Sequence, residues 1–259
     1  SPGISCGYCY YCLGGQDNLC RQYHVLGTQE DGTYAEYVKV PAVNVISIPD
    51  NLNFDQAAAI PLVFLTAWHM LVGLARLKAG ETILIHGAGS GVGSAAIQIA
   101  KLIGANIIAT AGSKEKLDKA KQLGADEVIN YHEMNFVDEV KRLTNKKGVD
   151  VIFEHIGGEV FEISITLLAK GGRFVTCGAT SSYKANVDLR YVYAKRLGIF
   201  GSFMGTKSEL LEVLKFFSEG RSNRKLIPVI DTILPLEKAS EAHRRMEERK
   251  NFGKIILKI

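Results

Sequence analysis

The stretch from Thr82 to Lys101, TILIHGAGSGVGSAAIQIAK, joins a buried β-strand pattern to an amphipathic helix through a turn of small residues. Such a turn places backbone N–H groups, and the positive end of the helix dipole, where a pyrophosphate binds. Of the three glycine positions in the G-x-G-x-x-G fingerprint, Gly93 keeps glycine, while Ala88 and Ser90 fill the other two with small side chains. The alternative is a tight turn without a ligand. We predict dinucleotide contacts at Ser90, Gly91, Val92 and Gly93.

Around this stretch, short β-branched segments alternate with helix-length amphipathic segments from Thr82 to Ser202. This alternation is typical of a parallel sheet covered by helices. The expected strands are TILIHGA, NIIATAG, EVINY, VDVIFEHI, GRFVTCG and LGIFGS. The expected helices include GSAAIQIAKLIG, KEKLDKAKQLG, NFVDEVKRLT and FEISITLLAKG, with left-handed C-caps at Gly104, Gly124 and Gly171. Six strands with crossover helices predict a Rossmann-type, doubly wound α/β domain.

The two ends of the chain have a different pattern. Residues Cys6–Pro49 are rich in turns and short strands, whereas ELLEVLKFFSEG and LEKASEAHRRMEER are helical and GKIILKI closes as a strand. We expect the two ends to form a second domain. The predicted division is 1–64 (partial catalytic domain), 65–204 (dinucleotide-binding domain) and 205–259 (return to the catalytic domain).

Composition excludes several classes of protein. The 259 residues are 47% hydrophobic and 22% charged, which suits a globular protein and not a collagen-like, disordered or membrane protein. The longest apolar run is interrupted by Pro61, and no secretory signal opens the chain, so we expect a cytoplasmic protein without membrane contact. A net charge of +4 predicts no nucleic-acid partner. The densest basic run, Gly220–Lys225, is expected to be a solvated loop, with a phosphate contact as the alternative.

Four of the five cysteines gather near the start of the chain, with the spacing C-x2-C-x2-C-x7-C. Four thiolates at such spacing can surround one tetrahedral zinc ion, and a site without an open position is structural. Disulfides, an iron–sulfur cluster and redox-active or unmetallated thiols are the alternatives. Disulfides need an oxidising compartment, and an iron–sulfur cluster usually has Pro after its last cysteine, where this chain has Arg21. Cys177 is expected to be a small buried hydrophobe. The predicted zinc ligands are Cys6, Cys9, Cys12 and Cys20.

The end of the second expected strand indicates which nicotinamide cofactor is used. An Asp or Glu there binds the ribose hydroxyls of NAD, but this stretch reads IIATAGSKEK, without an acid from Ala111 to Ser113. Ser113, Lys114 and Lys116 offer a hydroxyl and two cations to a 2′-phosphate. NADP(H) is therefore favoured over NAD. The alternative for these lysines is a solvated helix face.

Together with GTYAEYVKVP, LTAWHML and the terminal GKIILKI, these motifs resemble the medium-chain dehydrogenases of the zinc alcohol dehydrogenase type over essentially the whole chain. The resemblance implies a β-rich, GroES-like catalytic domain made from both termini, a structural zinc lobe, and a homodimer or homotetramer joined near LGIFGS. It also implies that Lys254 approaches the pyrophosphate and that Tyr131 contacts the 2′-phosphate. The loops implied to border the nicotinamide are Glu154–Gly158, Cys177–Thr180 (with Gly178) and Gly201–Met204.

The chain departs from this family in two ways. Members carry, before the cysteine lobe, a segment with a Cys and a His-Glu pair that bind a catalytic zinc, so we expect an N-terminal part to be missing. The third catalytic ligand of many members is a cysteine, and Leu62 stands at the matching position. No catalytic residue is assigned. His69 is expected to be packed on a helix rather than to face the cleft, and His86 and His155 have no partner visible in the sequence.

Three functions are compatible with these features. The leading hypothesis is an NADP(H)-dependent oxidoreductase that interconverts alcohols and aldehydes or ketones by hydride transfer. The second is a zinc-free NADPH-dependent quinone or enone reductase, which Leu62 favours. The third is a non-catalytic nucleotide-binding protein.

Overall fold

A computed structural model describes residues 1–218 and 226–259 of the chain. The basic run Gly220–Lys225 therefore lies outside the described residues. The chain divides into two compact units: residues 70–202 form one, and residues 1–69 together with 203–259 form the other.

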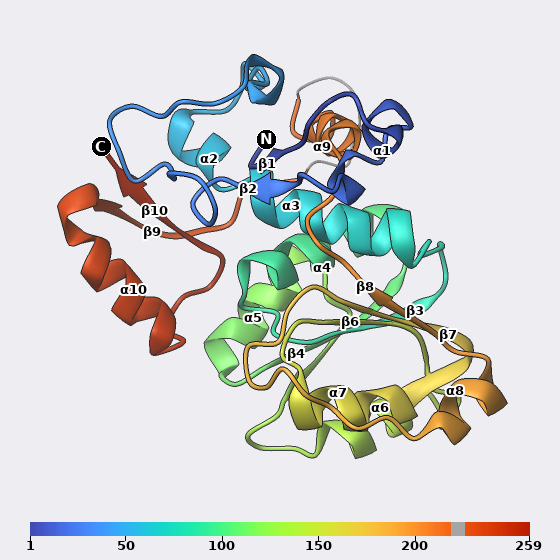
Figure 1. Ribbon diagram of the computed structural model, residues 1–259. Helices are drawn as coiled ribbons and strands as arrows, with labels where there is room; N and C mark the ends of the chain where they lie inside the picture. The colour runs from blue at the N-terminus through green and yellow to red at the C-terminus, as the bar shows by residue number, and fades with distance from the viewer. Residues whose placement is uncertain (219–225) are drawn as a thin grey trace. The chain divides into compact units, whose positions relative to one another are not determined.

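Unit 70–202 is built on a parallel six-stranded sheet with the order β5-β4-β3-β6-β7-β8 (Figure 1). The strands are β3 (Thr82–Ile85), β4 (Asn106–Ala111), β5 (Glu127–Asn130), β6 (Val149–Glu154), β7 (Leu168–Thr176) and β8 (Gly198–Gly201). This order is that of the Rossmann fold. The first three strands are added in one direction across the sheet, and the next three are added in the other direction, starting beside the first strand. The strand order therefore reverses between β3 and β6. The α/β prediction and its six strands are confirmed.

Helices cover both faces of this sheet (Figure 1). They are α4 (Gly91–Ile103), α5 (Lys114–Leu123), α6 (Phe136–Leu143), α7 (Gly158–Ser164), the short η4 (Ile165–Leu167) and α8 (Leu189–Lys195). Ser90 and Ser113 are the N-caps of α4 and α5, and each accepts a hydrogen bond from a backbone N–H three residues later. Gly104 and Gly124 end the same helices at φ of 93° and 115°, as left-handed C-caps should.

One helix end differs from the sequence prediction. Helix α7 ends at Ser164 and the following η4 ends at Leu167. Leu168–Gly171 belong to strand β7. Gly171 does have a positive φ, 75°, but it serves a turn-like irregularity inside the strand and not a helix C-cap. Leu168 is fully buried in the core, so burial overrides the helical propensity of the LLAK segment.

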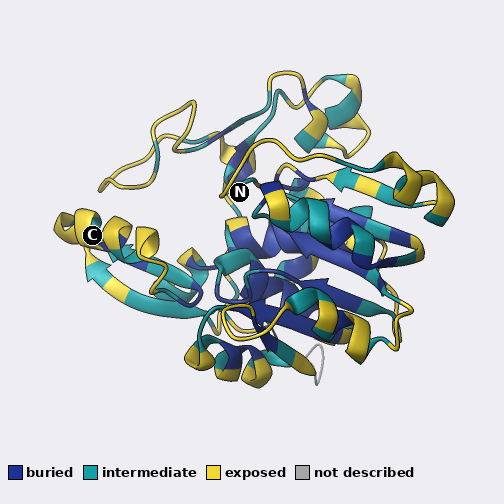
Figure 2. Cartoon of the chain, turned by 90° about the horizontal axis from the view of Figure 1, so that it is seen from below, coloured by how far each residue is buried: buried dark blue, intermediate teal, exposed yellow. Residues whose placement is uncertain are grey.

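The core of unit 70–202 lies between the sheet and its helices. Figure 2 shows buried residues concentrated along the strands, and one cluster joins the sheet to α6, η4 and the flanking apolar side chains. Continuous apolar strands of this kind are typical of a parallel sheet that is covered on both faces. The fully buried members of the cluster include Leu84, Ile129, Val140, Ile152, Leu168 and Phe174.

The other unit contains shorter elements. The first 69 residues form β1 (Gly3–Ile4), α1 (Tyr10–Leu13), η1 (Asp17–Leu19), β2 (His24–Val25), η2 (Ala42–Asn44), α2 (Phe54–Ala58) and α3 (Pro61–Trp68), and the short helix η3 (His69–Leu74) leads out of the unit. The C-terminal part contributes α9 (Lys207–Leu214), β9 (Ile230–Pro235), η5 (Leu236–Lys238), α10 (Ala239–Glu247) and β10 (Lys254–Lys258). Helix α3 packs on α9, and β9 pairs with β10 in parallel. Within the described residues, no helix is both long and apolar enough to cross a membrane.

Candidate functional site

The glycine-rich turn lies at the carboxyl end of β3, next to the point where the strand order reverses. Ser90 Oγ accepts a hydrogen bond of 2.9 Å from the N–H of Gly93, which fixes the first turn of α4. A Cβ on Gly93 would lie 2.3 Å from the carbonyl oxygen of Gly87, so the close approach of helix and turn requires glycine there. The four residues predicted to contact a dinucleotide thus lie together at the N-terminus of a 13-residue helix, where unpaired N–H groups attract an anion.

His155 lies against this turn, although the sequence shows no partner for it. Its Nε2 is 3.0 Å from Ser90 Oγ, and its ring occupies the space that a Cβ on Gly87 would need. Burial lowers the pKa of His155. The Ser90 hydroxyl, which accepts the Gly93 N–H, can donate its own proton to Nε2 of a neutral imidazole or accept a second hydrogen bond from a protonated one.

The loops that follow β6 and β7 are bonded to each other. The N–H of Thr180 donates to the carbonyl of His155, and the N–H of Ser181 to that of Ile156. A Cβ on Gly178 would lie 3.3 Å from the carbonyl oxygen of His155. The two loops that the family resemblance places beside the nicotinamide therefore form one connected surface.

Glu154, at the end of β6, holds the loop that follows this strand. Its carboxylate is fully buried and accepts hydrogen bonds from the N–H groups of Ile156 and Gly157 and from the hydroxyl of Thr176, the last at 3.1 Å. Burial raises the pKa of Glu154 despite these donors. Its role is to hold the loop that carries His155.

The residues predicted for a 2′-phosphate gather at the end of β4. A Cβ on Gly112 would lie 2.7 Å from the hydroxyl oxygen of Tyr131 and 2.9 Å from Nε2 of His132, so both polar atoms converge on one point above this glycine. Ser113 and Lys116 belong to the first turn of the adjacent helix α5. Sequence reasoning missed His132, whose position beside Gly112 depends on how the turn after β5 folds back on β4.

Two further histidines form hydrogen bonds within the fold. His86 is buried between the hydroxyls of Thr110 (3.2 Å) and Ser164 (2.9 Å), and burial lowers its pKa to about 3. His69 Nδ1 lies 2.9 Å from both carboxylate oxygens of Glu209, and its Nε2 lies 3.4 Å from Asn18 Nδ2. His69 is therefore packed, as expected, but with an acidic partner that lies 140 positions away in the sequence.

Two other sequence-predicted positions lie in the second unit. Lys254 begins β10, and burial lowers the pKa of its ammonium group. Leu62, which the family resemblance matches to a catalytic metal ligand, is 42% exposed on α3 and offers no ligand atom.

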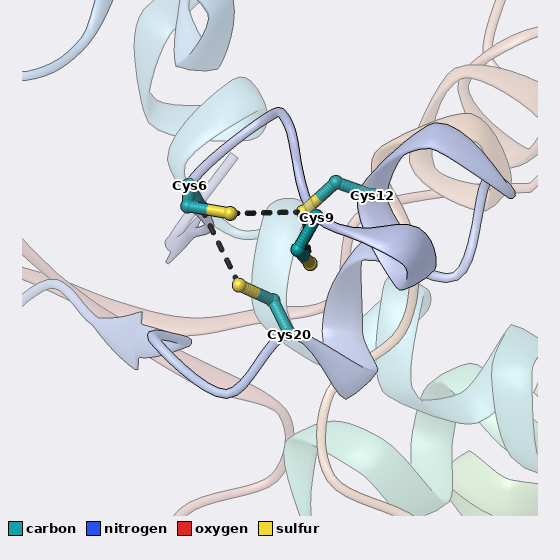
Figure 3. Close-up of side chains that lie close together, drawn as sticks. All are labelled: Cys6, Cys9, Cys12 and Cys20. Atoms are coloured by element: carbon teal, nitrogen blue, oxygen red, sulfur yellow. Dashed lines mark hydrogen bonds between the residues drawn. The ribbon is translucent and has the colours of Figure 1, made fainter.

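The four N-terminal cysteines converge on one point (Figure 3). All four sulfurs lie within 4.8 Å of one another, with Cys9–Cys12 at 3.5 Å and Cys6–Cys12 at 3.8 Å, and none forms a disulfide. Four sulfurs placed tetrahedrally at the Zn–S distance of about 2.3 Å would be about 3.8 Å apart. In the part of the chain that the structure describes, no other group of three or more His, Cys, Asp and Glu side chains could hold a metal ion.

Backbone N–H groups donate hydrogen bonds to sulfurs of this cluster. The N–H groups of Cys6 and Gln22 point at Cys20 Sγ from 3.5 and 3.4 Å. A hydrogen bond from the backbone of Tyr8 is the main cause that lowers the pKa of Cys6 to about 6. At Cys9 the backbone donor at Cys12 is instead outweighed by burial and by hydrogen bonds with the other sulfurs, which raise the pKa of Cys9 to about 11. The backbone donors thus favour the thiolate of Cys6, and thiolate is the form of cysteine that binds metals.

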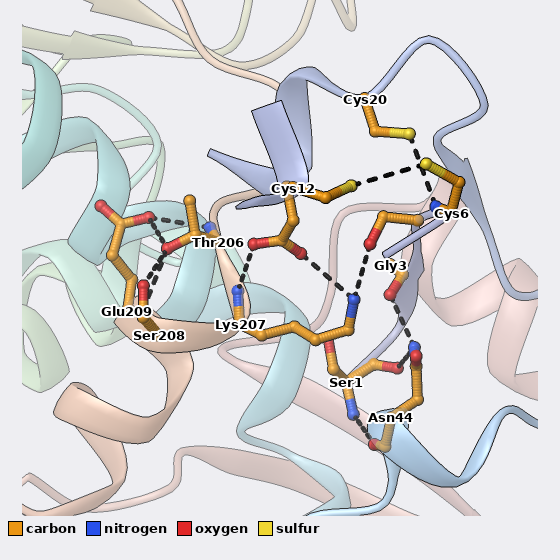
Figure 4. A network of polar contacts seen from close by, with 12 residues as sticks. Ser1, Gly3, Cys6, Cys12, Cys20, Asn44, Thr206, Lys207, Ser208 and Glu209 are labelled. Carbon is orange, nitrogen blue, oxygen red and sulfur yellow. Dashed lines mark hydrogen bonds and ion pairs between the residues drawn. The ribbon is translucent and has the colours of Figure 1, made fainter. Parts of the chain in front are cut away.

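The cysteine lobe, defined as residues 5–22, is fixed to helix α9 (Figure 4). Lys207 Nζ donates to Asp17 Oδ2 at 3.2 Å and to Ser5 Oγ at 2.9 Å, and the Lys207 N–H donates to Asp17 Oδ1 at 3.1 Å. The lobe thus connects the two ends of the chain within one unit.

Cys177, the fifth cysteine, follows β7 and is separate from this lobe. It is partly buried, and burial raises the pKa of its thiol to about 12. A thiol that stays protonated at neutral pH is a poor nucleophile. The expected burial is reached only in part, because Cys177 has intermediate exposure.

Comparisons with known proteins match this architecture. The alcohol dehydrogenase GroES-like domain family matches residues 1–50, and the zinc-binding dehydrogenase family matches residues 91–219. The quinone oxidoreductase of Homo sapiens is 38% identical over 229 residues, which are 87% of this chain and 69% of that protein.

Two solved structures resemble the chain closely. One, described as an NAD-dependent alcohol dehydrogenase, is 50% identical with a TM-score of 0.93 and covers 100% of this chain and 74% of its own. Another is the 2-octenoyl-CoA carboxylase reductase CinF in complex with NADP and 2-octenoyl-CoA, at 31% identity and a TM-score of 0.85; the match covers 92% of this chain and 57% of that one.

Proposed function

Because the chain belongs to the medium-chain dehydrogenase/reductase superfamily, whose members are oxidoreductases, we propose that it transfers hydride between NADP(H) and a small alcohol, aldehyde or ketone. The observation that carries this proposal is the turn Gly87–Gly93. It presents the N-terminus of α4 at the point where the strand order reverses, which is where open α/β sheets bind dinucleotides.

The residues present fit such a cofactor. The free N–H groups of Gly91 and Val92, at the start of α4, are suited to the pyrophosphate oxygens. Gly112 leaves open the space beside Tyr131, where a side chain would collide with that ring. When bound, the nicotinamide supplies or accepts the hydride.

The chain's own residues orient the reactants. Glu154 fixes the loop after β6 through two backbone N–H groups, and the hydrogen bonds from Thr180 and Ser181 join the loop after β7 to it. This connected surface, which includes Gly178, is the proposed support for the nicotinamide ring. Lys254 is proposed to approach the pyrophosphate, as the family resemblance implies.

The preference for NADP(H) rests on the end of β4. No carboxylate is present from Ala111 to Ser113 to bind the ribose hydroxyls of NAD. The hydroxyls of Ser113 and Tyr131 and the ammonium of Lys116 are proposed to bind the 2′-phosphate. The relative at 50% identity is described as NAD-dependent, so binding and turnover should be measured with both NADH and NADPH.

We also propose that Cys6, Cys9, Cys12 and Cys20 bind a structural zinc ion. Their sulfur separations agree with a tetrahedral site, and four thiolates leave no position for substrate. The lobe is therefore proposed to support the fold and not the hydride transfer.

A second function is favoured by Leu62. Without a ligand at this position, the enzyme would reduce quinones or enones with NADPH and without a catalytic zinc, and the human relative is named a quinone oxidoreductase. Rates of NADPH oxidation with ketones, aldehydes and enones, measured beside the zinc content per chain, separate the two. Two zinc ions with carbonyl turnover support the first function, and one zinc ion with enone turnover supports the second. Absence of NADPH binding contradicts both and leaves a non-catalytic protein.

The assembly is proposed to be a homodimer or homotetramer. Strand β8 pairs with β7 on one side and is the last strand in the order of the sheet. Such an open edge can join the same edge of a second copy. Light scattering of the purified protein tests this, and a monomer would contradict it.

A further inference from the structure

We propose that His155 takes up a proton when the dinucleotide binds, so that cofactor affinity is coupled to pH through the Ser90–His155 hydrogen bond. This inference rests on the proposed function, because it requires the pyrophosphate to bind at the turn Gly87–Gly93. It concerns a residue that touches the turn directly, through Nε2 at 3.0 Å from Ser90 Oγ.

In the cofactor-free protein burial favours neutral His155, because it disfavours the charged imidazole. Ser90 Oγ accepts the Gly93 N–H at 2.9 Å, and its own proton can be donated to Nε2 of the neutral ring at 3.0 Å. The neutral form therefore fits beside the hydroxyl that caps α4.

The protonated form also has acceptors in place. Hydrogen bonds to the backbone at Gly87 and at His155 itself favour the charged imidazole. The ring lies so close to Gly87 that a Cβ there would be 2.8 Å from Nε2. The second lone pair of Ser90 Oγ can also accept a hydrogen bond from a protonated Nε2 at the observed 3.0 Å. The residue can therefore carry a proton without losing its contact with Ser90.

A pyrophosphate at the N-terminus of α4 brings negative charge beside Ser90. An anion close to an imidazole stabilises the imidazolium and raises its pKa. The proton comes from solvent or buffer, and the imidazolium then adds a positive charge to a site that otherwise relies on backbone N–H groups. By linkage, affinity falls as the pH rises between the pKa of the free protein and that of the complex, by at most about tenfold per pH unit.

The titratable groups around these strand ends do not replace His155. His86, at the end of β3, has a pKa of about 3 and stays neutral. Cys177, after β7, has a pKa of about 12 and also stays neutral. Glu154, at the end of β6, has a raised pKa and can itself gain some protonation, so the test must separate its share from that of His155.

The experiment is calorimetric titration of NADPH into the full chain at pH 6.5 in two buffers of different ionisation enthalpy, which gives the number of protons taken up. The variant His155→Gln keeps an acceptor for Ser90 but cannot be protonated. The matched control is His243→Gln, on α10 in the other unit. Contributions from Glu154 and from the 2′-phosphate are common to all three proteins and cancel in the comparison.

We expect wild type and His243→Gln to take up about half a proton more per bound NADPH than His155→Gln. Equal uptake in all three proteins, with NADPH bound, would overturn the inference while leaving the proposed function intact. Failure of NADPH to bind the wild type would overturn both. If His155→Gln does not fold, NMR titration of the wild-type imidazole gives the answer: a higher pKa in the NADPH complex supports the inference, and an unchanged pKa overturns it.

Discussion

Lys207 Nζ lies 3.2 Å from Asp17 Oδ2, so a residue of the cysteine lobe forms an ion pair with the first residue of helix α9. The two residues are 190 positions apart, and their side chains are only 16% and 13% exposed. Removal of one partner leaves a largely buried charge, which costs much more than loss of an exposed ion pair. This contact is a main reason why the lobe is part of the fold.

Replacing Lys207 by Met should lower the free energy of unfolding by about 3 kcal/mol, because Asp17 then loses its cation in a largely buried position. Urea denaturation followed by circular dichroism measures the change. The control is Lys215→Met, which removes the exposed Lys215–Glu212 pair and should cost less than about 1 kcal/mol. Equal effects of the two substitutions would contradict the anchoring role of Lys207.

Replacing Cys9 by Ser should abolish the proposed zinc binding and lower the thermal midpoint, since the other three sulfurs cannot close a tetrahedral site. Metal content by elemental analysis, together with a melting curve, measures both effects. Hydride transfer per folded molecule should change little. Cys177→Ser is the control and should keep its metal; a fully folded Cys9→Ser protein without turnover would refute the structural assignment.

The sequence predicted those parts of the fold that depend on local patterns. The six strands and the glycine C-caps of α4 and α5 follow from periodicity and cap chemistry within a few residues. The segment Leu168–Gly171 is an exception: FEISITLLAKG predicts a helix up to Gly171, whereas the buried Leu168 begins β7.

The contacts that complete the candidate site could not be read from the sequence. Ser90 and His155 are 65 positions apart, and they meet only because parallel strands β3 and β6 end at the same edge of the sheet. His132 reaches Gly112 through an Asx turn after β5, in which Asn130 Oδ1 accepts the N–H of His132. The turn is local, but its position against β4 is not. Contacts of this kind depend on tertiary structure, which also decides the partner of His69.

Replacing Lys116 by Asp should raise the Michaelis constant for NADPH more than that for NADH, because a carboxylate would repel the 2′-phosphate. Steady-state kinetics with both cofactors measures the ratio, which we expect to change by about tenfold or more. Lys119→Asp, one turn further along α5, is the matched control and should leave the ratio close to that of wild type. Equal effects on the two cofactors would remove Lys116 from the site.

Stability should fall in acid through Glu81. Burial alone would raise the pKa of this carboxyl, but the Arg173 guanidinium, with N–O distances of 2.9 and 2.6 Å, outweighs burial and holds the pKa below its usual value. A lowered folded-state pKa gives stability that is complete above the unfolded value of about 4.3 and is lost as the pH falls through the folded value.

The thermal midpoint between pH 6 and pH 3 tests this effect. Glu81→Gln should be less stable than wild type at pH 6, and the difference should shrink toward pH 3. Glu237→Gln, at an exposed position, should follow the wild-type curve. A constant difference between Glu81→Gln and wild type at all pH values would show that the pair does not titrate in this range.

The most direct test of the dinucleotide site at the N-terminus of α4 is calorimetric titration of NADPH into the wild type and into Ser90→Asp. Aspartate is a good N-cap, so the helix should keep its cap while the added charge repels the pyrophosphate. We predict one site per wild-type chain with a Kd below about 1 mM, and no measurable binding by Ser90→Asp, whose fold is checked by circular dichroism because the carboxylate also faces His155. Equal binding by both proteins, or no binding by the wild type, would contradict the proposed cofactor site.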